Sequence, residues 1–162
     1  MAEVDHLNAT PNARLAGIDL EALYVAEWPK LIRLAYLMTS SESLAEEIAQ
    51  DAFVRIQETD SVVKNPGGYL RTSVVNRCRD VHRHRKVVER SPKQRVEVSV
   101  DETDELFDAL ANLSWRQHAA LVLRYHLDLA EVDIAAALDC RPSTVRSLTR
   151  RALANLRKEL SS

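Results

Sequence analysis

Apolar side chains recur every three or four positions along most of this 162-residue chain, and only 3 glycines and 5 prolines interrupt them. This spacing places the apolar residues on one face of successive amphipathic helices. A hydrophobic content of 46% is sufficient for packed cores and argues against a disordered or fibrous chain. The sequence therefore predicts an all-α protein.

The breaks in the apolar pattern define the expected helices. These helices are expected at residues 20–38, 44–56, 69–86, 106–113, 115–125, 130–138 and 142–160. The run from Asn65 to Gly68 indicates a loop, because its proline does not extend a helix and its paired glycines allow left-handed backbone. Ser114 and Gln117 fit a capping box, and Pro142 fits the first position of the last helix.

We expect two small helical domains joined by a flexible linker. The expected division is a disordered tail at residues 1–17, a first domain at 18–90, a linker at 91–104 and a second domain at 105–162. Val96, Val98 and Val100 alternate with polar residues in the linker, but no second strand signal is present to pair with them. The residues expected to face the cores are Leu20, Leu23, Trp28, Leu31, Leu34, Ala35, Met38, Leu44, Ile48, Ala52, Phe53, Ile56, Leu70, Val74, Val75, Cys78, Val81, Leu106, Leu110, Leu113, Val145, Leu148, Ala152, Leu156 and Leu160.

Charge is distributed in blocks of opposite sign, although the formal net charge of the whole chain is only −2. Residues 1–70 carry a net charge of −6, residues 71–95 of +7, residues 96–139 of −8 and residues 140–162 of +5. Each phosphate that a basic group neutralises releases counterions, so two basic blocks can hold a polyanion at two places. The pattern favours nucleic-acid binding over two merely solvated helix faces.

The two C-terminal helices, with a short turn between them at residues 139–141, predict a helix-turn-helix whose second helix enters the major groove of DNA. Hydroxyl and guanidinium groups on the N-terminal half of that second helix can meet base edges and phosphates. The residues expected to face outward there are Ser143, Thr144, Arg146, Ser147 and Arg150. Arg151, Arg157 and Lys158 lie further along and are expected to contact phosphates or solvent.

Short motifs also occur in a fixed order along the chain. In the second half they are residues 121–125 (LVLRY), 133–135 (DIA), 138–140 (LDC), 144–147 (TVRS) and 151–157 (RALANLR). In the first half they are residues 45–53 (AEEIAQDAF), 65–66 (NP), 69–71 (YLR), 76–77 (NR) and Asp80. Over roughly residues 18–160, these motifs resemble bacterial RNA polymerase sigma factors of the extracytoplasmic-function family.

The resemblance implies a transcription-initiation subunit with three binding surfaces. The residues implied to bind the clamp helices of the largest polymerase subunits are Glu46, Glu47, Gln50 and Asp51. The second domain would bind the polymerase flap. The minus-ten promoter element falls to Val62, Lys64, Asn65, Tyr69, Arg71, Asn76, Arg77, Arg79 and Arg83, with Val63 and Pro66 completing a pocket for a flipped base. The minus-thirty-five element falls to Arg141, Ser143, Thr144, Arg146, Ser147 and Arg150. Control by an anti-sigma factor is the usual regulation in the family.

Two residues of the expected turn depart from the family pattern. Asp139 stands where the family usually has glycine, so either the aspartate adopts left-handed backbone or the turn differs. Arg141 stands where the family often has a capping serine, which removes a side-chain acceptor from the first turn of the helix.

Catalysis has no support in the sequence, which contains no nucleophile elbow and no Gly-rich phosphate loop. Cys78 and His82 share a helix face, but His84 points elsewhere, so we expect no metal, no cofactor and no small-molecule substrate. Cys78 and Cys140 are expected to be reduced thiols. The chain is expected to be cytoplasmic, because no signal sequence or long apolar run occurs.

Three alternatives stay open at this point. The first is a helix-turn-helix regulator that acts without being a sigma subunit. The second is a metal-dependent nuclease that uses Cys78 and His82. The third is a decoy that binds polymerase or an anti-sigma partner without directing initiation.

Overall fold

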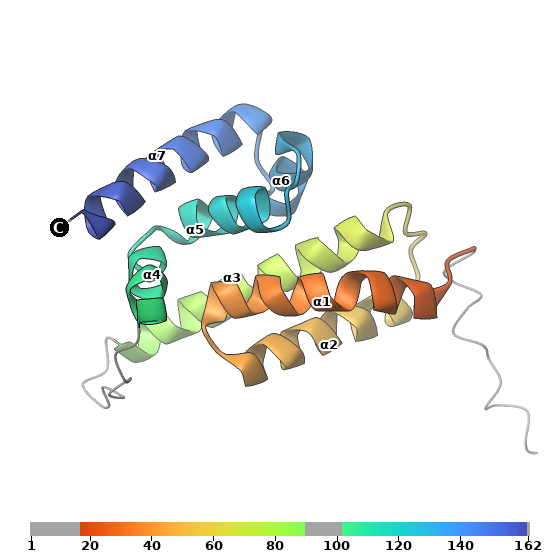
Figure 1. Ribbon diagram of the computed structural model, residues 1–162. Helices are drawn as coiled ribbons and strands as arrows, with labels where there is room; N and C mark the ends of the chain where they lie inside the picture. The colour runs from red at the N-terminus through yellow and green to blue at the C-terminus, as the bar shows by residue number, and fades with distance from the viewer. Residues whose placement is uncertain (1–16, 90–101, 162) are drawn as a thin grey trace, which may run out of the picture.

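The computed structural model describes residues 17–89 and 102–161, which form seven α-helices and one π-helical turn and contain no strand (Figure 1). The elements are α1 (Leu20–Thr39), α2 (Glu42–Glu58), α3 (Pro66–Glu89), α4 (Glu102–Ala111), α5 (Trp115–Leu121), η2 (Val122–His126), α6 (Glu131–Leu138) and α7 (Pro142–Leu160). The predicted all-α class is confirmed. The tail at 1–16 and the linker valines lie outside the described residues, and residues 102–104, expected in the linker, are helical.

Helices α1, α2 and α3 form one group around a shared apolar centre (Figure 1). Leu31 and Leu34 of α1, Ile48 and Ile56 of α2 and Val74 of α3 are fully buried there. Burial of an aliphatic side chain of this size contributes about 1.5–3 kcal/mol, so this centre is a main source of stability for the group. The predicted core faces of these three helices are confirmed.

Helices α4 to α7 form the second group. Leu110, Leu113 and Ala152 are buried between α4, α5 and α7, as their spacing predicts. Leu106 and Leu160 were also expected in the core, but they are 45% and 52% exposed. The α4 helix turns Phe107 rather than Leu106 toward α1, and Leu160 is the last residue of α7.

The two helical groups share one continuous apolar core. Fully buried residues of α3, such as Val75, belong to the same cluster as Leu123 of η2 and Ile134 of α6. The rings of Tyr36 in α1 and Phe107 in α4 meet edge to face, with centroids 5.5 Å apart. The second group therefore packs directly against α1 and α3.

The start of α3 differs from the prediction. The loop expected for Asn65 to Gly68 is wrong for its last three residues, because α3 begins at Pro66 rather than at Tyr69. Asn65 caps the helix, since its Oδ1 accepts the backbone N–H of Gly68 at 3.0 Å. Pro66 takes the first helical position, where a missing N–H has no cost.

The chain around the helix-turn-helix combines expected and unexpected features. Ser114 caps α5 by accepting the N–H of Gln117 at 3.3 Å, as predicted. The helix expected to run to Tyr125 instead changes to the π-helical turn η2, which the Leu127 N–H closes by donating to the Val122 carbonyl. Asp139 has φ 51° and ψ 55°, so the aspartate does adopt the left-handed backbone of the turn.

Candidate nucleic-acid and polymerase interfaces

The N-terminal half of α7 turns polar and basic side chains outward. Val145 is buried beneath this face and fixes the rotation of the helix. The predicted readers of the minus-thirty-five element all have access to solvent: Arg141, Ser143, Arg146 and Arg150 are exposed, and Thr144 and Ser147 are half-buried. Arg141 takes the N-cap position without a side-chain hydrogen bond, so its guanidinium has no capping role. This face is therefore sterically able to meet DNA.

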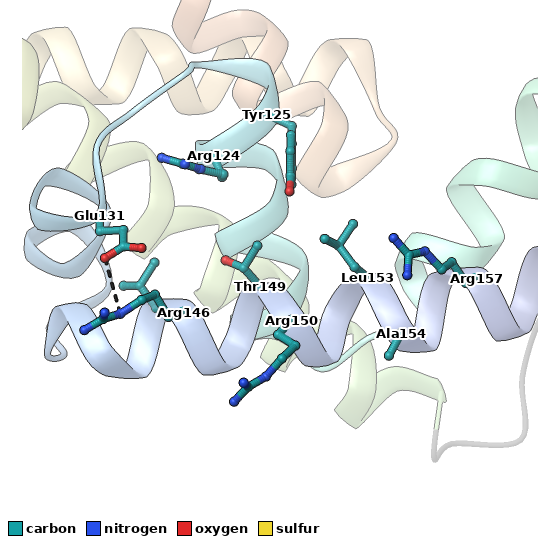
Figure 2. A pocket seen from close by; sticks show the side chains of 10 residues that line it. Arg124, Tyr125, Glu131, Arg146, Thr149, Arg150, Leu153, Ala154 and Arg157 are labelled. Atoms are coloured by element: carbon teal, nitrogen blue, oxygen red, sulfur yellow. Dashed lines mark ion pairs between the residues drawn. The ribbon is translucent and has the colours of Figure 1, made fainter.

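A hollow of about 410 Å³ lies between α7, η2 and the start of α6 (Figure 2). Arg124, Arg146, Arg150 and Arg157 contribute to its lining, and Glu131 is the acidic residue among the lining side chains. Arg124 is held in place, because its Nη1 donates to the Leu129 carbonyl at 3.3 Å. The lining has a net positive charge, which suits a phosphate backbone.

Glu131 forms an ion pair with Arg146, with Oε2 and Nε 3.5 Å apart. Figure 2 shows that the carboxylate reaches this guanidinium from the first turn of α6. Sequence reasoning missed Glu131, Arg124 and Tyr125 as members of this site. No local pattern links them to α7, because only the tertiary fold brings η2 and α6 beside it.

The predicted polymerase-binding face lies on α2. Glu46, Glu47 and Gln50 are exposed on that helix, whereas Asp51 is half-buried. Asp51 Oδ2 lies 4.0 Å from Nε of Arg77 on α3. The acidic face of α2 and the basic face of α3 therefore meet at this ion pair.

The predicted minus-ten residues divide into exposed and engaged side chains. Exposed members are Val62, Lys64 and Arg83, and half-buried members are Tyr69, Arg71, Asn76, Arg77 and Arg79. Asn65 is exposed, but its carboxamide oxygen is occupied in capping α3. Arg85 is not among the predicted minus-ten residues. It also has an internal contact, since its Nη1 donates to the Thr39 carbonyl at 2.6 Å.

Arg79 connects the two helical groups. Its guanidinium carbon lies 5.7 Å from the ring centroid of Trp115, at the start of α5. Sequence reasoning missed this contact between Trp115 and a predicted DNA-binding arginine. In the packed arrangement of the two groups, one face of the Arg79 guanidinium is therefore covered by α5.

His118 lies at the same boundary between the two groups. It is buried, and burial lowers its pKa to about 4; a hydrogen bond with the Leu37 backbone opposes this shift and the nearby His82 imidazole adds to it. His118 is therefore neutral at physiological pH. Contacts across the boundary thus include a neutral imidazole as well as apolar side chains.

The structure gives no support to the nuclease alternative. Burial raises the pKa of the Cys78 thiol to about 12, so this group is a neutral thiol at physiological pH. Within the described residues, no three His, Cys, Asp or Glu side chains gather as a metal site requires. Among the described helices, none combines the length and the apolar character that a membrane crossing requires.

The fold and the basic, outward face of α7 define a helix-turn-helix DNA-binding protein. Sequence comparison is more specific: Sigma-70 region 2 matches residues 23–87, and Sigma-70 region 4 matches residues 103–156. The RNA polymerase sigma-E factors of Streptomyces avermitilis and Streptomyces coelicolor are 32% and 31% identical to this chain over 142 and 140 residues. These alignments cover 82% and 80% of this chain and 79% of each relative.

A solved structure with the same fold is the sigma factor RpoE in complex with the anti-sigma factor NepR from Bartonella quintana. The match has a TM-score of 0.70 and 22% identity, and it covers 88% of this chain and 97% of the other. The present chain belongs to the RNA polymerase sigma factors of the extracytoplasmic-function family. It is a transcription-initiation factor that binds core RNA polymerase and directs initiation at specific promoters. A helix-turn-helix regulator that acts without being a sigma subunit is not favoured by these matches.

Proposed function

We propose that the N-terminal half of α7 reads the minus-thirty-five element, using Arg141, Ser143, Thr144, Arg146, Ser147 and Arg150. The observation that carries the proposal is that this whole set has access to solvent, above the buried Val145. Hydroxyl and guanidinium groups on an exposed helix face are the groups that read base edges in the major groove.

Footprinting of the holoenzyme on a promoter tests this assignment. The wild-type protein is expected to protect two spaced elements from hydroxyl radicals. The Arg150→Ala variant is expected to weaken protection of the upstream element while protection of the downstream element remains. Equal protection of both elements by the variant and the wild type would contradict the assignment.

The minus-ten element falls, in this proposal, to the loop before α3 and to its basic face: Val62, Lys64, Asn65, Tyr69, Arg71, Asn76, Arg77, Arg79 and Arg83. Exposed Val62, Lys64 and Arg83 are available directly. The guanidinium of Arg79 becomes fully available when Trp115 moves away from it. The corresponding division of the chain is a first domain at 18–90 and a second at 105–162, with residues 91–104 between them.

Simultaneous binding of both promoter elements requires the two helical groups to separate. Elements centred about 25 base pairs apart are about 85 Å apart along DNA at 3.4 Å per base pair. A compact protein of this length has a radius of gyration of about 15 Å, and hence a diameter of about 40 Å. The packed arrangement, in which α1 and α3 touch the second group, is therefore too short to span both elements.

Core polymerase binding is assigned to Glu46, Glu47, Gln50 and Asp51, because exposed acidic and amide groups on one helix suit a basic partner helix. We assign the clamp helices of polymerase to this face and the flap to the second domain. A Glu46→Lys/Glu47→Lys variant is expected to lose binding to purified core polymerase.

Glu58→Lys is the matched control for this binding experiment. Glu58 is an exposed acid on the same helix, about 17 Å away along its axis from Glu47 at 1.5 Å per residue. It is expected to bind core polymerase as the wild type does. Equal binding by both charge-reversed proteins would contradict the assignment of the docking face.

Control by an anti-sigma factor is part of the same proposal. Its support is the family membership together with the fold shared with RpoE, which was solved with NepR. The protein would act in the cytoplasm as a binding subunit, without a cofactor and without chemistry of its own. Co-purification from its host, followed by transcription with the captured partner added back, tests the regulation. Inhibition is expected, and activity unchanged by every captured partner would contradict it.

A further inference from the structure

We propose that Glu131 positions the guanidinium of Arg146 to read a guanine, which makes Glu131 a determinant of promoter specificity. This inference rests on the proposed role of α7 in recognising the upstream element. The carboxylate comes from the first residue of α6, the supporting helix of the helix-turn-helix, and reaches across to the reading helix (Figure 2). The pair therefore connects the two helices of the helix-turn-helix, which are joined by the turn that contains Asp139.

The nitrogen used by the ion pair is the central observation. Glu131 Oε2 faces Nε of Arg146, the guanidinium nitrogen that is bonded to Cδ. The two terminal nitrogens of a guanidinium held in this way are free, and they are the donors that bind guanine O6 and N7 together. An arginine already held in one orientation also loses less side-chain freedom when it binds.

Stability is a poor explanation for this ion pair. The Arg146 and Glu131 side chains are 66% and 38% exposed, and exposed ion pairs contribute little to folding. The surrounding lining is basic, with Arg124, Arg150 and Arg157 around the same hollow. A carboxylate at this place weakens general attraction to phosphates, so it reduces nonspecific binding while it orients one base-reading group.

Asp133 provides a matched control. It lies in the same first turn of α6, is exposed, and interacts in the same favourable way with the N-terminal end of the helix dipole. Glu131→Gln and Asp133→Asn each remove one negative charge from this turn. Only Glu131→Gln removes the partner of Arg146.

The test uses holoenzyme reconstituted from core polymerase and full-length protein. A promoter library is randomised across the upstream element and keeps one fixed downstream element, and the promoters that yield transcripts are sequenced. The proteins compared are the wild type, Arg146→Ala, Glu131→Gln, Asp133→Asn and the Arg146→Ala/Glu131→Gln double variant. Thermal unfolding of each protein establishes that the variants are folded.

The wild type is expected to enrich guanine at one position. Arg146→Ala is expected to reduce this preference about tenfold, because a bidentate contact is lost. Glu131→Gln is expected to reduce it roughly two- to fivefold at the same position, in keeping with the strength of an exposed ion pair. Asp133→Asn is expected to keep it, and the double variant is expected to match Arg146→Ala alone.

The possible contradictions are distinguishable. An unchanged guanine preference in Glu131→Gln, or an equal loss in Asp133→Asn, overturns the positioning role while the reading role of Arg146 stands. A preference unchanged at every position in Arg146→Ala contradicts the proposed function of α7, and with it the role of Glu131.

Discussion

The basic faces of α3 and α7 are built differently. On α3, predicted DNA-binding side chains also make internal contacts: Arg77 pairs with Asp51, and Arg79 covers Trp115. On α7, the predicted base readers project from a helix whose buried side, including Val145, does the packing. The ion pair of Arg146 with Glu131 lies on the same outward surface.

On α7, different residues serve DNA recognition and packing. On α3, the same residues serve both. Substitutions on the outward face of α7 should change DNA selection and leave stability intact. Substitutions on α3 should change stability or the contact between the helical groups as well as promoter binding.

Arg146→Ala should give the largest change in promoter selection. We expect discrimination among upstream elements to weaken by about 1–3 kcal/mol, because contacts with a base are lost. Arg157→Ala should instead weaken binding to all sequences alike and reduce the salt dependence by about one counterion. Competition binding of holoenzyme to matched and mismatched promoters measures both effects. Equal losses across sequences for the two variants would contradict base reading by Arg146.

Acidification should destabilise the boundary between the groups through His118. The pKa of His118 in the folded protein is about 4, below the ordinary value of 6.5, so its stabilising effect is complete above pH 6.5 and is lost as the pH falls toward 4. Between pH 7 and pH 5 the free energy of unfolding should fall by roughly 2 kcal/mol from this group. Urea unfolding of the wild type and of His118→Gln at both pH values isolates the contribution. The same pH dependence in both proteins would rule it out.

Asn65→Ala should affect folding and promoter opening together. Loss of the cap on α3 is expected to reduce stability by about 1 kcal/mol, since Gly68 loses its side-chain acceptor. Asn65→Asp keeps an acceptor oxygen and should keep the stability. A proposed role in holding the minus-ten element predicts that both variants lose open-complex formation, measured by permanganate reactivity. If Asn65→Ala loses both stability and open-complex formation while Asn65→Asp keeps both, Asn65 has only a structural role.

Arg79→Ala should give the smallest change in stability. Removal of its contact with the Trp115 ring is expected to lower the free energy of unfolding by about 0.5–1 kcal/mol. Arg83→Ala removes an exposed arginine of the same helix and should leave stability unchanged. Chemical denaturation of the two variants makes the comparison. Equal stability of the two variants would show that Arg79 contributes as little to folding as the predicted DNA-reading side chains on α7.

Much of the fold is local and could be predicted from the sequence. Apolar spacing predicted the buried faces of α1, α2 and α3, and Ser114 predicted the start of α5. The start of α3 was also available, because asparagine followed by proline is a helix-start signal. The two glycines after Pro66 outweighed it in the prediction, although the first turn of a helix accommodates them.

The site was predictable where helical geometry alone decides orientation. Rotation of α7 follows from its apolar spacing, so the outward set that includes Ser143 could be found from sequence. The contacts of Arg79 with Trp115 and of Arg146 with Glu131 could not, because they join residues on different helices. Such pairs depend on tertiary packing, which local periodicity does not encode.

The most direct test of the account is multi-round transcription with purified bacterial core polymerase and a genomic promoter library, with and without this protein. A sigma factor whose α7 reads the upstream element should yield new, discrete start sites preceded by two spaced elements, and Arg146→Ala should weaken the preference at the upstream element. Polymerase binding without new transcripts would support a decoy. Sequence-specific retention of DNA by the protein alone, without transcripts, would support a conventional regulator, and either result would contradict the account.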